Sequence, residues 1–410
     1  MPARIWMVTV LVLSSAGVAL GYDLLQASAE STAYDAPQGP AYPLGNCGDC
    51  CFRGYESGVG VRLEYLMWWS GGQFVPPLAT TSPAGTLRED AGVLGEPGTQ
   101  VLFGGTELGQ IFRNGGRLTV DYAIPDGCHR RIVGRLYGVE DGRETFVGTP
   151  GENDILARPF TNVGLGAPDA LLISFPGVVD GDGRMFAQTR NDFLGTDLYL
   201  QQRMCDNGCF TLDWLAGYQF ARLDDALYIE STGTSIDPQS PIPLGTMVEV
   251  VDHFRTRNEF HGASVGILGS NRSGPWRLEY LFKFGIGNVH QTSIVEGRTT
   301  VTEPEASSVT STGGLLALPT NIGTLTRDRF TIVPEVNFNI GYQLDQQWSL
   351  LFGYTFLYFP NAVLSGAQVD TRVNLSQLTG PIVGDARPAP RLENTHFWLQ
   401  GMSLGAEYRF

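Results

Sequence analysis

The feature that most constrains this chain is a period-two alternation of apolar and polar residues, repeated in many short segments. The clearest segment is residues 329–344, where Phe330 and Ile332 alternate with polar residues such as Glu335. Successive side chains of a strand point to opposite faces of a sheet, so one face of this segment suits lipid and the other suits water. Pro334 lies inside the segment and removes a backbone hydrogen-bond donor, which predicts a β-bulge there.

Further segments with this alternation are expected to be strands. They are residues 61–69, 117–123, 131–140, 193–202, 210–220, 257–268, 276–286, 348–358 and 398–410. The connections between them are alternately short (125–130, 205–208, 269–275 and 345–347) and long (71–115, 141–190, 224–252, 302–327 and 360–393). Short periplasmic turns and long extracellular loops are typical of transmembrane barrels. We predict about ten strands, or twelve if residues 277–301 turn at Gly287-Asn288, with both termini on the periplasmic side.

The N-terminus has the features of a secretory signal. Arg4 precedes a short apolar run over residues 5–20, and Ala27-Ser28-Ala29 has the small-x-small form of a cleavage site. Cleavage after Ala19 and a retained membrane anchor are the alternatives. The expected organisation is a signal peptide (1–29), a periplasmic cysteine-bearing leader (30–57) and an outer-membrane β-barrel (58–410). Beyond the signal, no apolar run approaches the ~18–20 residues of a spanning helix.

The last strand and the composition indicate the same class. The chain ends in alternating apolar residues and Phe410, which resembles the terminal signature of bacterial outer-membrane barrels. We expect Tyr408 and Phe410 to be the signal read by a barrel-assembly machinery. A soluble β-sandwich is the alternative, but it does not explain the loop asymmetry. With 52 Gly, 24 Pro and a net charge of −15, the composition suits strands and turns and argues against a nucleic-acid partner.

The predicted fold class is therefore all-β: one closed antiparallel transmembrane barrel surrounded by outer-membrane lipid in a Gram-negative-type envelope. Aromatic residues near the strand ends fit two girdles at the membrane interfaces, with carbohydrate stacking as the alternative. The residues assigned to the girdles are Trp68, Trp69, Tyr358 and Phe359 at the outer end and Trp214, Trp276, Trp348 and Phe410 at the periplasmic end.

Longer motifs identify a family resemblance. They are Arg62-Leu63-Glu64-Tyr65-Leu66-Met67-Trp68-Trp69, Gly92-Val93-Leu94-Gly95-Glu96-Pro97-Gly98-Thr99, Gly217-Tyr218-Gln219-Phe220 and the run from Gly314-Leu315-Leu316-Ala317 through Asn321-Ile322-Gly323 to Pro334-Glu335. The chain resembles a family of outer-membrane β-barrel porins from planctomycete-type bacteria, formerly a domain of unknown function, over nearly all of its mature length. The resemblance implies an outer-membrane barrel and no particular transport activity. Residues 359–366 depart from the family pattern, which is more basic there.

The six cysteines all fall on the side assigned to the oxidising periplasm. Cys205 and Cys209 bracket Asn207-Gly208, which favours a tight hairpin, and we predict a disulfide between them. The others are Cys47, Cys50, Cys51 and Cys128, of which Cys128 is expected to pair with a leader cysteine. Cys47-x-x-Cys50 has the spacing of a zinc or redox site, but no second pair at similar spacing follows it. We expect no metal and no cofactor.

The charged residues on the inward faces are the candidate functional residues. They are Arg62, Glu64, Arg117, Asp121, Arg135, Asp213, Arg277, Glu279, Lys283, Glu335, Glu407 and Arg409. The functional interpretation is a selectivity lining for small polar solutes, giving a porin-like, narrow, passive permeability. The alternative is a network of ion pairs that fills a narrow lumen, as about eight strands leave an interior just filled by side chains.

A closed barrel with a structural or surface-interaction role is therefore the second functional hypothesis. A third, more distant one is an outer-membrane hydrolase, since Gly262-Ala263-Ser264-Val265-Gly266 matches the serine-nucleophile pattern. That motif needs a strand-to-helix turn, whereas Ser264 lies inside an alternating strand, and nothing places His253 or His261 beside it. We expect no enzymatic activity.

Overall fold

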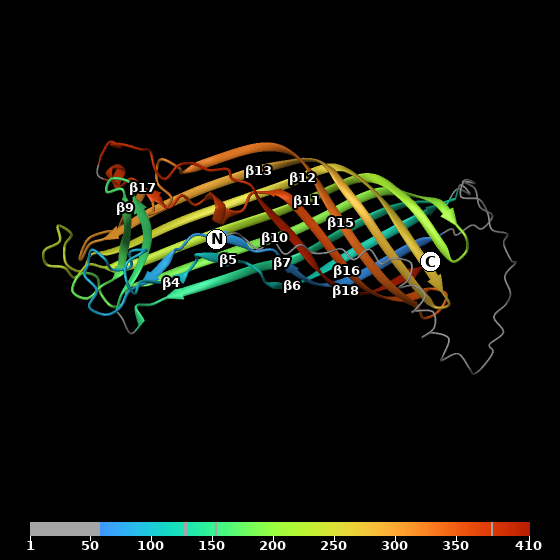
Figure 1. Cartoon of the computed structure of the whole chain (residues 1–410), viewed down its shortest axis with the longest axis horizontal. Helices are drawn as coiled ribbons and strands as arrows, with labels where there is room; N and C mark the ends of the chain where they lie inside the picture. Colours follow the sequence, from blue (N-terminus) through green and yellow to red (C-terminus); the bar gives the residue numbers. More distant parts are fainter. Residues whose placement is uncertain (1–57, 126–128, 152–153, 379) are drawn as a thin grey trace. The chain divides into compact units, whose positions relative to one another are not determined.

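The computed structural model describes residues 58–125, 129–151, 154–378 and 380–410. Ten antiparallel strands within these residues form a closed ring, which confirms the predicted fold class (Figure 1). In ring order they are β1 (Val59–Ser70), β6 (Phe112–Ile124), β7 (Arg130–Gly148), β10 (Arg184–Asp206), β11 (Phe210–Thr234), β12 (Met247–Ser273), β13 (Trp276–Thr302), β15 (Gly323–Gln343), β16 (Trp348–Ala362) and β18 (Thr395–Arg409).

The ring closes where the first and last strands pair. The register between β1 and β18 runs from Gly60 opposite Arg409 to Ser70 opposite Leu399. The alternative with twelve strands is wrong, because β12 and β13 pair without interruption past residues 287–288. The bulge predicted at Pro334 is also wrong. The pairing of β15 with β16 begins at Glu335, so Pro334 lies just beyond the paired residues. The N–H that Pro334 lacks is therefore not needed for a hydrogen bond to β16.

The outward face of the ring carries an apolar belt. Exposed apolar side chains come from every ring strand, and one example from each, in ring order, is Leu63, Leu118, Leu136, Leu198, Tyr218, Val265, Phe282, Ile332, Phe352 and Leu404. An apolar surface of this extent suits a lipid environment. The girdle assignment was wrong for two residues: Trp68 and Phe359 are buried on the inward face, whereas Trp69 is exposed on the outside. Among the described residues, no helix is long and apolar enough to span a membrane.

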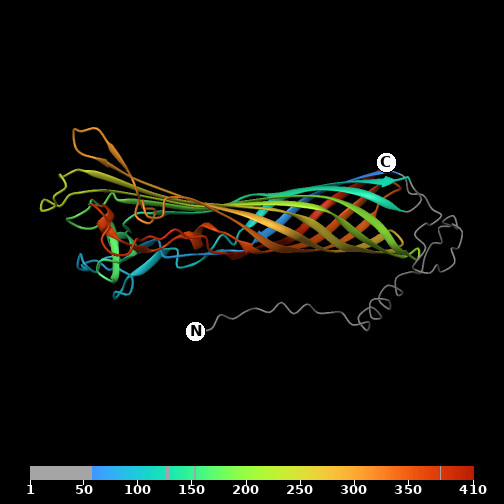
Figure 2. The ribbon, with the colours of Figure 1, turned by 90° about the horizontal axis from the view of Figure 1, so that it is seen from above.

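The strands differ greatly in length. β1 has 12 residues, whereas β12 and β13 have 27 each. Figure 2 shows the long strands continuing past the closed ring as a curved sheet on one side. We call this part the wall: residues 184–192 of β10, 222–234 of β11, 247–259 of β12 and 288–302 of β13. Much of what the sequence predicted as long loops is therefore strand.

Smaller elements pack on the inner face of the wall and form what we call the head. They are β2 (Gln73–Val75), β3 (Ala79–Thr81), β4 (Gln100–Phe103), β5 (Thr106–Leu108), β8 (Leu156–Asn162), β9 (Ala167–Ser174), β17 (Arg372–Val373), the 3-10 helices η2 (Ser365–Gln368) and η3 (Leu375–Leu378), and the loops between them. The short strand β14 (Val309–Thr312) instead pairs with β13 and extends the wall. β3, β4, β8, β9 and β17 share one sheet, and β2 pairs with β5.

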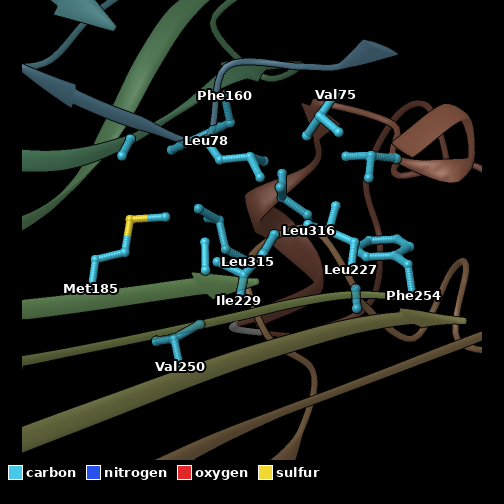
Figure 3. Close-up of a cluster of buried hydrophobic side chains, with 14 of the residues drawn as sticks. Val75, Leu78, Phe160, Met185, Leu227, Ile229, Val250, Phe254, Leu315 and Leu316 are labelled. Carbon is cyan, nitrogen blue, oxygen red and sulfur yellow. The ribbon is translucent and has the colours of Figure 1, made fainter. Parts of the chain in front are cut away.

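An apolar core joins the head to the wall (Figure 3). Met185, Leu227, Ile229, Val250 and Phe254 come from the wall, and Val75, Leu78, Phe160, Leu315 and Leu316 come from the head. Each fully buried side chain of this size contributes about 1.5–3 kcal/mol. The head is therefore fixed to the wall by a conventional hydrophobic interface.

The predicted disulfide between Cys205 and Cys209 is wrong. Cys209 is a free, exposed thiol, whereas Cys205 is disulfide-bonded. Strand register gives the reason: Cys205 lies opposite Leu212 on β11, and Cys209 sits in the turn between β10 and β11. The signal peptide, the leader with Cys47, Cys50 and Cys51, and Cys128 lie outside the described residues.

Candidate functional site

The barrel interior is built from every second residue of the ring strands. In β1, for example, the inward side chains Arg62, Glu64, Leu66 and Trp68 alternate with the outward belt. The chemistry of these inward side chains changes along the lumen. Charged residues lie nearest the end with the short turns, and apolar residues lie further from it. The two sets form an ion-pair layer and an apolar layer.

The first network of the ion-pair layer lies near the short turns. Arg62 on β1 contacts Glu407 on the neighbouring β18 at 2.8 Å and Glu279 on β13 at 3.0 Å. Arg277 also pairs with Glu407 and lies 3.2 Å from Glu279, and Arg409 contacts Glu407 at 2.6 Å. Because β1 and β13 are separated by three strands along the shorter path, the Arg62–Glu279 pair crosses the lumen.

A second network lies further from the short turns. Arg135 on β7 contacts Asp197 on β10 at 2.5 Å and Glu335 on β15 at 2.7 Å. Lys283 on β13 contacts the same two carboxylates at 2.7 and 2.8 Å. β7 and β15 lie on opposite sides of the ring, so Arg135 reaches across it. All four side chains are at most 5% exposed.

The remaining candidate charges are paired more locally. Arg117 makes two contacts of 2.7 Å with Glu64 on the neighbouring strand and reaches Thr355 on β16 at 3.2 Å. Asp121 pairs with Arg131 at 2.8 Å, and Asp213 pairs with Arg203 at 2.5 Å. The twelve residues expected to face the lumen thus all lie in ion pairs on the inward face.

Sequence reasoning missed three members of these networks: Arg131, Asp197 and Arg203. All three lie on strands with weak alternation, β7 and β10. The sequence pattern does indicate that they face inward, since Asp197 is next to the exposed Leu198 and Arg131 is next to the exposed Ile132.

The apolar layer closes the lumen beyond the ion pairs. Its members are Leu66, Trp68, Tyr137, Val139, Phe193, Ala221, Leu223, Phe260, Val333, Leu357, Phe359, Ala362, Leu364, Phe397 and Leu399, all buried. The rings of Trp68 and Tyr137 are 6.3 Å apart, those of Tyr137 and Phe193 6.0 Å, and those of Phe193 and Phe359 5.7 Å. Since β10 and β16 lie on opposite sides of the ring, this chain of rings spans the lumen.

Little space is left between these side chains. A cavity of about 110 Å³ lies within the ion-pair layer, lined by Arg62, Arg117, Glu279 and Asn339 among others. A volume of this size holds a few water molecules. The charges of the two networks are therefore paired with one another, and a layer of buried aromatic rings lies next to them.

The mouth of the ring is covered by the segment between β16 and β18. Asp225 of β11 accepts hydrogen bonds from the Ser365 N–H at 2.8 Å and from Gln73 Nε2 at 2.9 Å. Asn258 of β12 accepts a hydrogen bond from the Val363 N–H at 2.7 Å. These buried polar groups tie residues 363–366 across the opening, and Leu364 adds to the apolar layer.

A second buried carboxylate anchors the head. Asp252 Oδ1 accepts the N–H groups of Leu315, Leu316 and Ala317 at 3.0, 2.9 and 2.7 Å, and the other oxygen pairs with Arg158 of β8. Three amides converging on one carboxylate hold this turn against the wall. The most family-specific stretch of the sequence is therefore a structural anchor in the head.

The hydrolase pattern does not form a catalytic arrangement in the described residues. Ser264 is fully buried and faces the lumen, whereas His261 is exposed on the outward face, where its ring nitrogen lies 2.6 Å from the Tyr218 hydroxyl. Within the same residues, no group of three His, Cys, Asp or Glu side chains is arranged to hold a metal ion.

The closed ring and its lipid-facing belt define an outer-membrane β-barrel protein. The chain belongs to the family described as "Putative beta barrel porin-7 (BBP7)", whose model matches residues 61–410. This finding confirms the family indicated by the sequence motifs.

Solved structures with similar folds include other outer-membrane proteins. The Escherichia coli outer membrane protease OmpT covers 88% of this chain and 100% of its own, at 11% identity and a TM-score of 0.40. A Pseudomonas aeruginosa FadL homologue covers 86% of this chain and 90% of its own, at 9% identity and a TM-score of 0.27. No curated protein matches the chain.

Proposed function

We propose that this protein is a closed outer-membrane barrel whose working part is the head, acting as a structural or surface-interaction platform rather than as a channel. The observation that carries the proposal is the chain of aromatic rings from Trp68 to Phe359 across the lumen. A hydrated ion would have to displace these rings and also break the ion pairs between Arg135, Lys283, Asp197 and Glu335.

The energetics favour a permanently closed lumen. Breaking a buried ion pair so that one charge is left unpaired costs about 3–5 kcal/mol. A path through the barrel needs several such events together with the opening of the apolar layer. The covering segment at residues 363–366 adds a third obstacle on the side of the head.

Single-channel recording in planar bilayers tests the proposal. We expect the wild-type barrel to be silent. The variant Phe193→Ala/Phe359→Ala/Arg135→Ala/Glu335→Ala, which removes one bridge from each layer, should conduct and so show that the assay detects an open lumen. The matched control Phe282→Ala/Phe338→Ala removes two lipid-facing rings and should stay silent. Stable, salt-dependent steps from the wild-type protein would overturn the proposal.

A second candidate function is the porin-like, narrow permeability to small solutes. The family description favours it, and the ion-pair layer supplies charges of both signs. The same recording separates the two candidates, because even a narrow pore gives measurable current at high salt.

The remaining parts of the proposal concern location and partners. The protein is exported by its N-terminal signal, is inserted by a barrel-assembly machinery that reads Tyr408 and Phe410, and lies in outer-membrane lipid without catalysing a reaction. Phe410 supports this role, since it is 72% exposed at the barrel end and its ring packs on Tyr408 at 4.7 Å.

A further inference from the structure

The head contains a cavity of about 600 Å³, far from the lumen. It lies between β9, the ends of β11 and β12 at the tip of the wall, and the loops at residues 88–93 and 235–242. This volume falls within the range of small-molecule binding sites in proteins, about 300–1,000 Å³. The cavity in the ion-pair layer is several times smaller.

The walls of this cavity are held by main-chain contacts. Val179 bridges to Ser235, the Ile236 N–H donates to the Val178 carbonyl at 3.0 Å, and the Asp180 N–H donates to the Thr234 carbonyl at 2.9 Å. Gly233 packs so closely that a Cβ there would lie 2.8 Å from the Ile173 carbonyl oxygen. The cavity is therefore formed before any ligand arrives, which reduces the entropic cost of binding.

The interior surface of the cavity is mainly apolar. Leu171, Leu172, Ile173, Val179 and Val248 all line it. Of these, Leu171, Leu172, Val179 and Val248 are only half-buried although they belong to the interior of the head. Half-buried aliphatic side chains that line a cleft gain free energy when an apolar molecule displaces water from them.

The charges around the cavity are unbalanced. Three carboxylates, those of Glu89, Asp169 and Asp237, line it against the single guanidinium of Arg88. Arg88 pairs with Asp237 at 3.2 Å, joining two loops, and its side chain is 59% exposed. An exposed pair of this kind contributes at most about 1 kcal/mol, so a ligand can displace it readily. A positively charged ligand that displaces Arg88 would pair with Asp237 and would also be favoured by Glu89 and Asp169.

We infer that this cavity is a binding site for a compact amphipathic organic cation, with its apolar body against β9 and the wall and its charge near Asp237. The inference deepens the proposed function, since it assigns the head a ligand. It rests on the proposed function only because it treats the head as the working part of the protein. Titration tests ligand binding and single-channel recording tests the closed barrel, so a negative result in one leaves the other standing.

The test is isothermal titration of the full-length protein in lipid nanodiscs, with empty nanodiscs subtracted. The probes are tetraphenylphosphonium and tetraphenylborate, which share size and shape and differ in the sign of their charge. We expect saturable binding of the phosphonium, at least tenfold tighter than that of the borate. Equal affinities, a preference for the borate, or no saturable heat from either ion would overturn the inference.

Two pairs of variants locate the binding. Leu172→Trp fills the cavity and should reduce phosphonium binding at least tenfold, whereas Leu165→Trp, which adds the same ring at the exposed β8–β9 turn, should not change it. Asp237→Asn should weaken binding several-fold, whereas Asp182→Asn, outside the cavity, should not. Unchanged hydrogen exchange of residues 156–174 in the head shows that each variant is folded there. Phosphonium binding that survives Leu172→Trp would place the site elsewhere and overturn the inference.

Discussion

The lower and upper halves of β11 show opposite chemistry on one continuous strand. Near the short turns, the outward side chains are apolar (Leu212, Tyr218) and the inward ones polar (Asp213, Gln219). Beyond Phe220 the relation reverses: Leu223, Leu227 and Ile229 face inward and are buried, whereas Arg222, Asp224 and Glu230 face outward. The alternation of burial continues through both halves, so the two regions share a backbone and differ in their surroundings.

The reversal follows from what lies on each side of the sheet. Near the short turns, lipid is outside and the ion-pair layer is inside. In the wall half, water is outside and the head is inside. A strand can meet both conditions because its side-chain period is the same in either environment. The point of reversal therefore marks the outer limit of the apolar belt.

The largest expected effect is in the ion-pair layer of the barrel half. Asp197→Leu leaves Arg135 and Lys283 sharing one carboxylate, and we expect a loss of about 3–5 kcal/mol in the free energy of unfolding. Denaturant titration in lipid vesicles measures it. The matched variant Asp197→Leu/Lys283→Met removes one charge of each sign and should recover most of the loss. If the double variant is no more stable than the single one, pairing is not what stabilises this layer.

The next effect compares the outward faces of the two halves directly. Ala216 and Ala226 are both half-buried on the outward face of β11, ten residues apart. Ala216→Arg places a charge in the apolar belt and should cost about 2–4 kcal/mol. Ala226→Arg places the same charge in water, where the cost should stay below about 1 kcal/mol. The same denaturant titration measures both, and equal losses would mean that the belt does not end between them.

Much of the barrel half could be predicted from the sequence, because apolar outward residues alternate with charged inward ones on a strand such as β13. The same alternation at both ends of the chain predicted that the barrel closes by pairing of its first and last strands. The apolar layer inside the lumen was harder to predict. Leu66 and Trp68 lie an even number of residues after Arg62, so the alternation places them on the same, inward face. In a run of apolar residues, however, a Trp is equally expected on the outside, in a girdle at the membrane interface.

The wall and head could not be predicted in the same way. Leu223, Leu227 and Ile229 lie at odd-numbered positions of β11, whereas the apolar residues of its barrel half, such as Leu212 and Tyr218, lie at even-numbered ones. Which set faces inward cannot be decided until the partner of the inward face is known. That partner is built from distant segments, such as residues 315–318. The disulfide predicted between Cys205 and Cys209 was wrong for a local reason. The register of β10 and β11 places Leu212, not Cys209, opposite Cys205.

A smaller effect is expected at the anchor of the head. Asp252→Asn keeps an acceptor for the three amides of residues 315–317 but removes the charge that pairs with Arg158, which should cost about 1–3 kcal/mol locally. Hydrogen exchange of residues 314–322 should accelerate while that of the barrel half stays unchanged. Glu249→Gln, on the outward face of the same strand, is the matched control. Faster exchange throughout the barrel would show that the two halves unfold together.

The smallest effect concerns acid. Burial alone would raise the pKa of Asp370, but hydrogen bonds from the Ala389 N–H at 3.0 Å and from Arg387 at 2.8 Å hold this pKa below its ordinary value. A carboxyl whose pKa is lower in the folded state stabilises that state at pH values above its unfolded pKa of about 3.9, and the contribution is lost as the pH falls through the folded pKa.

Residues 370–391 should therefore detach from the head first as the pH is lowered below about 4. Hydrogen exchange of this segment, corrected for the intrinsic rate at each pH, measures the change. In Asp370→Asn the segment should exchange faster at neutral pH and lose this acid-dependent step, whereas Asp385→Asn should behave as the wild type does. Because the segment belongs to the head, the barrel half should remain protected throughout. Simultaneous loss of protection in both halves would mean that the ion-pair layer, rather than the head, responds first to acid.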